Sequence, residues 1–343
     1  MCAASFKMEK NYSLKNLNTF GINAFANYFS EINSVQETLE ILDNPISKQN
    51  PLLLIGGGSN LLFTKNFAGL VLKNNIKGIE LIKEDADYFY VKSGAGVVWH
   101  QLVLHCIENN YAGIENLSLI PGNVGAGPMQ NIGAYGVELK DVFYELEALH
   151  IQEKQVYVFS NSDCKFGYRE SVFKRELKNK FIITSVTLRL NKKPVFKIEY
   201  GAIQKELETM GIQNLSIGAI SKAVCNIRSS KLPDPNKIGN AGSFFKNPIV
   251  SVEKFDSLKN NFPEIIGYKN SEHEIKLAAG WLIEQCGWKG KIVGNAGVHK
   301  DQALVLVNYG NANGQEIFDL SEAILQSVKN KFDVQLEREV NII

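Results

Sequence analysis

The sequence predicts a mixed α+β protein with more than one domain, and three observations support this prediction. At 343 residues, the chain is longer than a single hydrophobic core usually serves. Short apolar runs of strand length occur along the whole chain, and segments with helical apolar spacing lie between them. Hydrophobic residues make up 45% of the sequence, which is enough to fill a separate core for each domain.

The first part of the chain alternates predicted strands with predicted helices. A short helix is expected at 35–42, and apolar residues recur at helical spacing from Trp99 to Asn109. The turn Gly94-Ala95-Gly96 precedes this second helix. Strands are predicted at 51–55, where the continuous apolar run indicates burial, and at 68–73 and 88–93.

The middle of the chain reads as β-structure, because β-branched and aromatic residues dominate it. The predicted strands are 146–151, 155–159 and 181–190. Pro194 and Gly201 then interrupt the chain, and the pattern changes to helix plus strand. We therefore predict a first domain at 14–195, in two parts of about 14–73 and 74–195, and a second domain at 196–330.

The second domain has its own helical and strand signals. Apolar residues at helical intervals predict a helix at 275–286, with Gly287 as its stop, and a second amphipathic helix at 317–328. A strand is expected at 303–307. Apolar and polar residues alternate along 332–342, which predicts a C-terminal strand within 331–343.

Charge and cysteine usage exclude several classes of function. The 37 Lys and Arg residues nearly balance the 36 Asp and Glu residues, and no basic block is present, so a nucleic-acid partner is not expected. The cysteines are scattered singly, which argues against a metal site and against a disulfide framework. We expect reduced thiols at Cys2, Cys106, Cys164, Cys225 and Cys286.

No run approaches the ~20 apolar residues of a membrane span, and the N-terminal residues lack an apolar core of signal-peptide length. We therefore expect a cytoplasmic protein with no membrane partner.

Two glycine-rich stretches are candidates for ligand binding. The stretch 120–136, IPGNVGAGPMQNIGAYG, has five glycines and no Lys, Arg, Asp or Glu, so it is neither a solvated loop nor a regular helix. Such a backbone can pass close to a flat or phosphorylated ligand and present N–H groups to it. The second stretch, Gly56-Gly57-Gly58-Ser59-Asn60, follows an apolar run and is a candidate phosphate seat. The alternative for the first stretch is a glycine-rich turn in the core.

Common nucleotide and hydrolase motifs are absent or incomplete. The turn at Gly94 lacks the third glycine of a dinucleotide-binding fingerprint, because Trp99 occupies that place. The sequence has no GxxxxGK[ST] motif. Ser243 has no GxSxG context and no obvious His partner, which disfavours a hydrolase triad.

Taken together, GGGSN, the 120–136 stretch, FGYR at 166–169 and GNAGSFFKNP at 239–248 resemble one family. It is the family of flavin-dependent UDP-N-acetylenolpyruvoylglucosamine reductases, known as MurB, and the resemblance runs from about Asn18 to Glu339. It implies a two-part FAD-binding domain of the vanillyl-alcohol-oxidase (PCMH) type, a separate α/β substrate-binding domain and a C-terminal strand that returns to the active site. The segment around Tyr200 resembles the form of the family with an additional tyrosine-bearing loop over the substrate.

The resemblance also assigns three catalytic residues. Ser243 matches the proton donor, and Arg169 matches the arginine that holds the enolpyruvyl carboxylate and steadies the developing enol. Glu339 matches the terminal glutamate beside the same intermediate. Pattern alone cannot separate it from Glu337, which lies on the same face, whereas the family alignment favours Glu339. Asn341 stands where relatives commonly carry Arg. Taken singly, Arg169 would be a surface charge and Ser243 a backbone cap.

The remaining assignments follow from the resemblance as well, although each residue alone would more often be an ordinary loop or surface residue. The expected FAD-binding residues are Gly56, Gly57, Gly58, Ser59, Asn60, Pro121, Gly122, Gly125, Gln130, Asn131, Gly133, Ala134 and Tyr135. Those expected on the uridine diphosphate part of the substrate are Tyr200, Lys231, Asn247, Lys289 and Gln302. No metal is expected.

The implied reaction is part of peptidoglycan precursor synthesis. NADPH reduces non-covalently bound FAD, and flavin N5 then delivers hydride to the enolpyruvyl group of the sugar nucleotide, which enters the same cleft. The cofactor supplies the redox chemistry, and the protein orients and polarises the reacting groups. The alternatives are an FAD-dependent sugar or alcohol oxidase and a flavin-binding protein without turnover. Oxidases often tether flavin through His or Cys, and neither occurs in 51–63 or 120–136. A monomer is expected.

Overall fold

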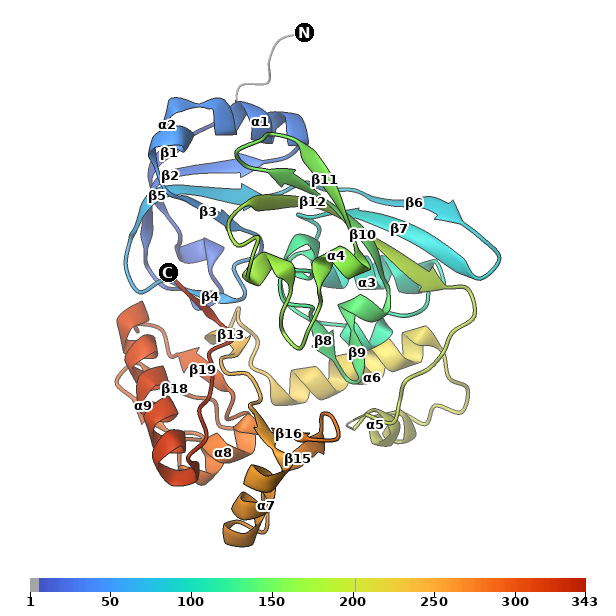
Figure 1. The fold of residues 1–343 in the computed structure, drawn as a ribbon, viewed down its shortest axis with the longest axis vertical. Coiled ribbons are helices and arrows are strands. Elements are labelled where there is room, and N and C mark those ends of the chain that lie inside the picture. The colour runs from blue at the N-terminus through green and yellow to red at the C-terminus, as the bar shows by residue number, and fades with distance from the viewer. Residues whose placement is uncertain (1–5, 201) are drawn as a thin grey trace. The chain divides into compact units, whose positions relative to one another are not determined.

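The protein is described by a computed structural model that covers residues 6–200 and 202–343. The expected thiol of Cys2 and the predicted boundary residue Gly201 lie outside the described residues. The chain forms two compact units, whose elements are labelled in Figure 1. Unit 1 consists of the chain up to Tyr12, Ala26–Gly57 and Ala68–Ser230, and unit 2 consists of Ser13–Phe25, Gly58–Phe67 and Lys231–Ile343.

These units divide the chain differently from the predicted domains. The segment from 196 to Ser230 belongs to unit 1, because its helices share a core with residues of the glycine stretch. Two short segments of the N-terminal region belong to unit 2. One of them carries β4 (Leu61–Leu62), which pairs in parallel with the C-terminal strand β20 (Asn341–Ile342). Pairings over such long sequence distances leave no local signal.

A four-stranded sheet in unit 1 has the order β1-β2-β5-β3. Its strands are β1 (Glu9–Ser13), β2 (Phe25–Ile32), β3 (Leu52–Ile55) and β5 (Phe67–Asn74). The last two run parallel, with Leu53 opposite Val71. Only Ile55 of β3 is buried, so the continuous apolar run there does not reflect a fully buried strand.

The five-stranded sheet of unit 1 has the order β11-β10-β12-β7-β6, and its neighbouring strands are antiparallel. Its strands are β6 (Ile79–Glu84), β7 (Tyr88–Gly94), β10 (Phe143–His150), β11 (Val156–Ser160) and β12 (Phe181–Asn191). The central strand β12 is buried along almost its whole length. Its β-branched residues predicted a strand at 181–190, and the structure confirms it.

Some helices of unit 1 begin at side-chain caps, and the longer ones bury apolar stripes. They are α1 (Val35–Asp43), α2 (Pro45–Gln49), α3 (Trp99–Glu108), α4 (Asn161–Cys164), α5 (Ile203–Thr209) and α6 (Ile217–Lys231). The side chain of Ser34 caps α1 by accepting a hydrogen bond from the N–H of Glu37. The buried side chains of α3 are Trp99, Leu102, Val103 and Cys106, as its spacing predicts.

Unit 2 contains a four-stranded sheet of order β13-β19-β18-β17 and a three-stranded sheet of order β14-β16-β15. The strands are β13 (Gly239–Ser243), β14 (Ile249–Ser251), β15 (Gly267–Lys269), β16 (Glu274–Leu277), β17 (Ile292–Val293), β18 (Ala296–Val298) and β19 (Val305–Asn308). The helices are α7 (Val252–Asn261), α8 (Ala279–Gln285) and α9 (Gly314–Phe332). The side chains of Asn313 and Glu316 form a capping box at the start of α9.

Two predicted elements of unit 2 differ from the observed ones. The helix predicted at 275–286 begins only at Ala279, because Ile275 lies in β16 and pairs with Val250. The predicted C-terminal strand is regular only at Asn341–Ile342, although the preceding residues keep the alternating burial. Single backbone bonds replace a ladder there, and Arg338 forms an isolated bridge with Phe245.

No helix within the described ranges is both long enough and apolar enough to cross a lipid bilayer. In the same ranges, no group of three or more His, Cys, Asp and Glu side chains is placed to hold a metal ion. Cys106, Cys164, Cys225 and Cys286 are all unpaired thiols. Burial raises the pKa of Cys106 and of Cys164 to about 12, which keeps both thiols protonated.

Candidate active site

The two glycine-rich stretches meet within unit 1. A Cβ placed on Gly57 would lie 2.9 Å from Oδ1 of Asn123 and 3.1 Å from Cα of Gly122. A Cβ placed on Gly125 would lie only 2.6 Å from Cβ of Ala95, in the third glycine turn. Glycine is therefore required at 57 and 125 for the turns to approach one another, in addition to any contact with a ligand.

Hydrogen bonds hold these turns in place. The side-chain amide of Asn123 donates to the carbonyl oxygen of Gly96 at 2.9 Å. The N–H of Trp99, the first residue of α3, donates to the carbonyl oxygen of Gly122 at 2.9 Å. The result is a rigid surface of small residues without charged side chains. It fits the close approach of a flat ring or a diphosphate, so these residues are suited to hold FAD.

The last three residues of GGGSN belong to unit 2, and the first of them, Gly58, meets the turn at 17–21. Gly58 has φ = +65°, and a Cβ there would lie 1.9 Å from the carbonyl oxygen of Leu17. The N–H of Thr19 donates to the carbonyl oxygen of Gly58 at 3.1 Å. The side-chain amide of Asn18 closes its own turn by donating to the carbonyl oxygens of Leu14 and Ile22. The glycine and this N-terminal turn thus form one structural element.

The amide side chain of Asn131 links the glycine stretch to the FGYR motif. It donates to Oε2 of Glu138 at 2.9 Å and to the carbonyl oxygen of Gly167 at 3.0 Å. Its Oδ1 accepts from the N–H of Lys140 at 3.0 Å. Asn131 is fully buried, and these bonds hold the glycine stretch against the FGYR motif. Its expected contact with FAD stays a prediction.

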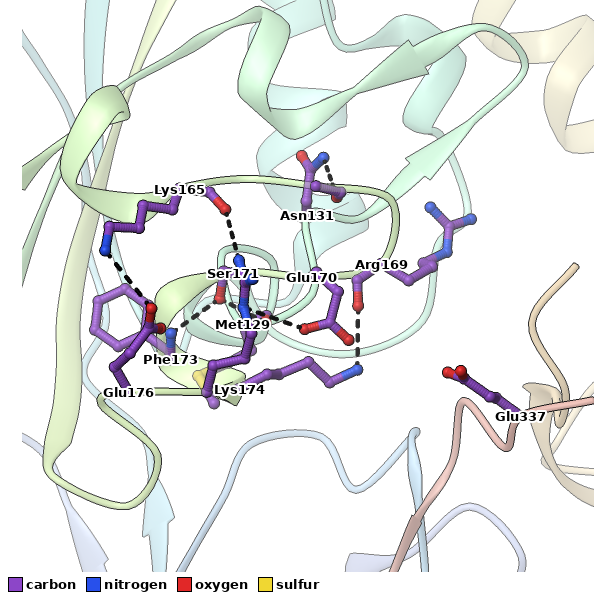
Figure 2. A network of polar contacts seen from close by, with 12 residues as sticks. Met129, Asn131, Lys165, Arg169, Glu170, Ser171, Phe173, Lys174, Glu176 and Glu337 are labelled. Atoms are coloured by element: carbon purple, nitrogen blue, oxygen red, sulfur yellow. Dashed lines mark hydrogen bonds and ion pairs between the residues drawn. The ribbon is translucent and has the colours of Figure 1, made fainter. Parts of the chain in front are cut away.

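Arg169 contacts the glycine stretch, and Figure 2 shows the polar network around its backbone, in which its carbonyl oxygen accepts a hydrogen bond from Nζ of Lys174. Its Nη2 donates to the carbonyl oxygen of Gly133 at 2.7 Å, and its guanidinium lies 5.4 Å from the ring centroid of Tyr168. Its φ is +55°, a left-handed conformation that a non-glycine residue rarely adopts. Ser171 fastens the same motif by donating from Oγ to the carbonyl oxygen of Met129 at 2.7 Å. The arginine is therefore held in one orientation, and such backbone strain is common at functional positions.

A second arginine, Arg228 on α6, was not among the predicted residues. Its Nε is buried and has no hydrogen-bond partner among the described residues. Burial lowers the pKa of its guanidinium, and the positive charge of Arg169 lowers that pKa further. Arg228 follows Ile220 and Val224 at helical spacing, on the stripe that α6 buries. A charge on a buried stripe was the sequence signal that could have identified it.

Ser243 and Glu339 come together in unit 2. Ser243 ends β13, directly after Gly242, whose φ is +68°. The N–H of Glu339 donates to the carbonyl oxygen of Phe244, the next residue, at 2.8 Å. The side-chain amide of Asn60 donates to the carbonyl oxygen of Glu339 at 3.3 Å. The proton donor and the terminal glutamate assigned by resemblance are thus neighbours in the fold.

The two rival carboxylates differ in their surroundings. Glu337 is a surface residue, with 72% of its side chain exposed, and its Oε2 lies 3.1 Å from Nζ of Lys246. Glu339 is half-buried. Asn341 donates from both its backbone and its side chain to the carbonyl oxygen of Asn60. The choice of Glu339 over Glu337 as the functional carboxylate stays a prediction.

Of the predicted substrate residues in unit 2, only Asn247 and Gln302 lie at the same place in the fold. Asn247 accepts a hydrogen bond from the N–H of Ala279 at 3.0 Å, at the start of α8. Oε1 of Gln302 would lie 3.4 Å from a Cβ placed on the next residue, Gly280. Asn247 and Gln302 therefore both contact the first turn of α8. Lys289 lies beyond the other end of this helix and pairs with Glu284 at 3.0 Å.

The other two predicted substrate residues are exposed. Lys231 is the last residue of α6. Tyr200 is 51% exposed and approaches the glycine stretch, since a Cβ placed on Gly136 would lie 3.2 Å from the Cβ of Tyr200. The predicted tyrosine-bearing segment thus lies against the predicted flavin loop within unit 1.

Comparison with protein families gives two matches. Residues 27–155 match the family model described as FAD binding domain. Residues 234–343 match the model described as UDP-N-acetylenolpyruvoylglucosamine reductase, C-terminal domain. The glycine turns lie within or next to the first match, and Ser243 and Glu339 lie within the second.

Full-length relatives carry the name of one enzyme. The chain is 50% identical to the UDP-N-acetylenolpyruvoylglucosamine reductase of Flavobacterium johnsoniae, over 98% of this chain and 100% of the relative. It is 52% identical to the reductase of Amoebophilus asiaticus, over 98% and 99% of the two chains. The reductase of Bacteroides fragilis is 45% identical, over 98% and 100%.

A solved structure supports the fold. The crystal structure of the reductase from Thermus caldophilus has a TM-score of 0.69, at 22% identity, and covers 98% of this chain and 99% of that one. The predicted α+β fold with an FAD-binding domain is confirmed. Because full-length relatives share about half of its residues, the chain belongs to the UDP-N-acetylenolpyruvoylglucosamine reductase (MurB) family.

Proposed function

We propose that this protein is an FAD-dependent oxidoreductase that uses NADPH to reduce the enolpyruvyl group of UDP-N-acetylglucosamine enolpyruvate to UDP-N-acetylmuramate. The reaction belongs to peptidoglycan precursor synthesis. The observation that carries the proposal is the backbone hydrogen bond from Glu339 to Phe244, which brings Glu339 next to the strand end that carries Ser243. Family membership over the full chain supports it.

FAD, when bound, supplies the hydride chemistry, and the glycine turns would hold it. The turns at 56–58 and 122–127 offer backbone N–H groups, and Asn123 keeps them in place. The other expected contacts, from Ser59 and Asn60 and from the loop at 130–135, remain part of this proposal. The protein orients the reacting groups and polarises them.

Ser243 is the proposed proton donor to the enolpyruvyl carbon. A serine hydroxyl is a weak acid, so it can donate only to a strongly basic carbon and with nearby polar groups that stabilise the resulting alkoxide. The carboxylate of Glu339 stabilises the enol-like intermediate from the neighbouring stretch of backbone. Arg169, held by its bond to Gly133, binds the enolpyruvyl carboxylate with an always-charged fork.

The diphosphate and uridine are assigned to Tyr200, Lys231, Asn247, Lys289 and Gln302. A lysine suits a phosphate as a point charge, and an amide or phenol suits it as a hydrogen-bond donor. Asn247 retains its side-chain N–H₂ for a ligand, because its oxygen is the atom that binds Ala279. The proposed location is the cytoplasm and the proposed assembly is a monomer, which light scattering of the purified protein would test.

Two alternatives remain distinct from this proposal. A sugar or alcohol oxidase would consume oxygen with a free sugar or alcohol, and a binding protein would not turn over. The decisive experiment measures NADPH oxidation by its absorbance, with and without the enolpyruvyl sugar nucleotide. We expect oxidation only with the nucleotide, and FAD released intact on denaturation. Flavin that stays attached to the denatured chain, or turnover only with oxygen and a simple sugar, would support the oxidase.

A further inference from the structure

The third glycine turn, Gly94-Ala95-Gly96, packs against a loop of unit 1 that lies outside the sequence motifs. This holding loop, defined here as residues 75–78, directly follows β5. The N–H of Gly96 donates to the carbonyl oxygen of Ile76 at 2.8 Å. A Cβ placed on Gly96 would lie 2.5 Å from the carbonyl carbon of Asn75. The turn and the holding loop are therefore in direct backbone contact.

A lysine side chain of the holding loop adds a second connection to this turn. Nζ of Lys77 donates a hydrogen bond to the carbonyl oxygen of Gly96, which lies 19 residues further along the chain. The side-chain amide of Asn123 donates to the same oxygen at 2.9 Å. A carbonyl oxygen has two lone pairs, so it can accept both bonds at once. Gly96 thus connects the holding loop to the glycine-rich stretch 120–136.

Asn123 extends this connection to the first glycine turn. A Cβ placed on Gly57 would lie 2.9 Å from Oδ1 of Asn123, so this side chain fills the space between Gly57 and Gly96. The bond from Lys77 therefore fixes the carbonyl oxygen against which Asn123 is oriented. All of these residues belong to unit 1, and the turns that they join are those suited to hold FAD.

We propose that Lys77 is a positioning residue for FAD, because its ammonium group fixes the carbonyl oxygen of Gly96 and so sets the spacing of the glycine turns. This inference rests on the proposed function, in which these turns hold FAD. A charged donor forms a stronger hydrogen bond than a neutral one, so the bond holds the turn although Lys77 is an exposed residue. Without the ammonium group, fewer molecules keep the spacing that FAD needs, and the apparent affinity falls by that fraction.

The test measures how fast the purified holoenzyme releases FAD after dilution, from the rise in flavin fluorescence. Lys77→Met keeps an unbranched stem and removes the ammonium group. We expect FAD release to become ~5-fold faster, a modest change because an exposed charged group contributes little. Lys77→Arg keeps a charged donor, so its release rate should stay within ~2-fold of that of the unmodified protein. Neither substitution removes a buried side chain, so both variants should fold.

Lys92→Met is the matched control. Lys77 and Lys92 line the same cavity of about 500 Å³, but Nζ of Lys92 pairs with Oε1 of Glu147 at 2.8 Å instead of with a glycine turn. We expect this variant to release FAD at the unmodified rate. Equal acceleration in Lys77→Met and Lys92→Met, or an unmodified release rate in Lys77→Met, would overturn the inference.

A comparison with Asn123→Ala tests whether the two donors act through one oxygen. Each single variant keeps one side-chain donor on the carbonyl oxygen of Gly96, whereas the double variant with Lys77→Met keeps neither. We expect the double variant to release FAD faster than the product of the two single effects predicts, because residues that share a partner are coupled. Independent effects would contradict positioning through Gly96.

Hydrogen–deuterium exchange separates this inference from the proposed function. In protein freed of FAD, exchange of residues 94–96 should be faster in Lys77→Met than in Lys92→Met, and this measurement needs neither cofactor nor turnover. Equal exchange in the two variants would contradict the role of Lys77. If the unmodified protein holds no FAD, the proposed function fails, whereas the exchange rates still decide whether Lys77 holds the turn.

Discussion

The backbone N–H of Glu339 donates to the carbonyl oxygen of Phe244 at 2.8 Å, which places the C-terminal glutamate beside Ser243 although almost 100 residues separate them in the sequence. From this relationship, we predict that Glu339→Gln lowers kcat ~10²–10³-fold, because it replaces the acidic group assigned beside the enol-like intermediate. Steady-state NADPH oxidation measures the effect.

Glu337→Gln is the matched control for this substitution. Glu337 forms an exposed ion pair with Lys246, and such pairs contribute little to stability. We expect kcat within a few-fold of the unmodified value. A larger loss in Glu337→Gln than in Glu339→Gln would mean that the catalytic glutamate is misassigned.

A second prediction concerns the contact between the glycine turns. Gly57→Val and Gly125→Val should purify with little FAD, because even the first side-chain atom would collide with Asn123 or Ala95. Gly125→Ala should show a partial loss for the same reason. The ratio of flavin to protein absorbance measures occupancy.

Gly218→Ala serves as the control for these glycine variants. Gly218 lies in α6, and the nearest atom to a Cβ placed there is 3.7 Å away, which is an ordinary contact. Full FAD occupancy is expected in this variant. Full occupancy in Gly57→Val and Gly125→Val as well would show that the turn contact is dispensable.

The local elements could be predicted from the sequence, whereas the contacts between distant segments could not. The strand at 181–190 was predicted correctly because its β-branched residues suit a buried sheet, and the strand predicted at 146–151 overlaps β10. The helix predicted at 275–286 is present as α8, but its start was placed too early, because a short apolar run has the same spacing in a strand and in a helix end.

The residues of the candidate site show the same difference between local sequence motifs and contacts of distant segments. Motif resemblance identified Ser243, Arg169 and Glu339, and their catalytic roles stay predictions. Arg228 was missed because the helix that carries it, α6, was not predicted from the sequence.

A third prediction concerns Arg228. Since its Nε is buried without a hydrogen-bond partner among the described residues, the guanidinium is costly in the ligand-free protein. Arg228→Met should raise the melting temperature of the ligand-free protein and weaken binding of the anionic sugar nucleotide ~10- to 100-fold. Thermal melting and flavin absorbance titration measure the two effects. Lower stability together with normal binding would show a purely structural role.

A fourth prediction concerns the pH dependence of stability. Glu115 is 3% exposed, and burial raises the pKa of its carboxyl group, although hydrogen bonds from backbone N–H groups oppose the shift. An acid whose pKa is raised by folding binds more protons in the folded state, so its contribution to stability falls as pH rises above its unfolded pKa of ~4.3. Glu115→Gln should therefore gain melting temperature relative to the unmodified protein as pH increases from 4 to 8. A constant difference over this range would contradict the shift.

The central claim is that Ser243 donates the proton to the substrate and takes no part in flavin reduction. Loss of a positioned general acid typically costs ~10²–10⁴-fold in rate. Stopped-flow absorbance separates the two half-reactions in Ser243→Ala. We predict that NADPH bleaches the flavin of this variant at nearly the normal rate, that the enolpyruvyl sugar nucleotide restores its colour at least ~10²-fold more slowly, and that Ser243→Cys retains more activity. An alanine variant that is slow to bleach and normal in colour recovery would contradict the account.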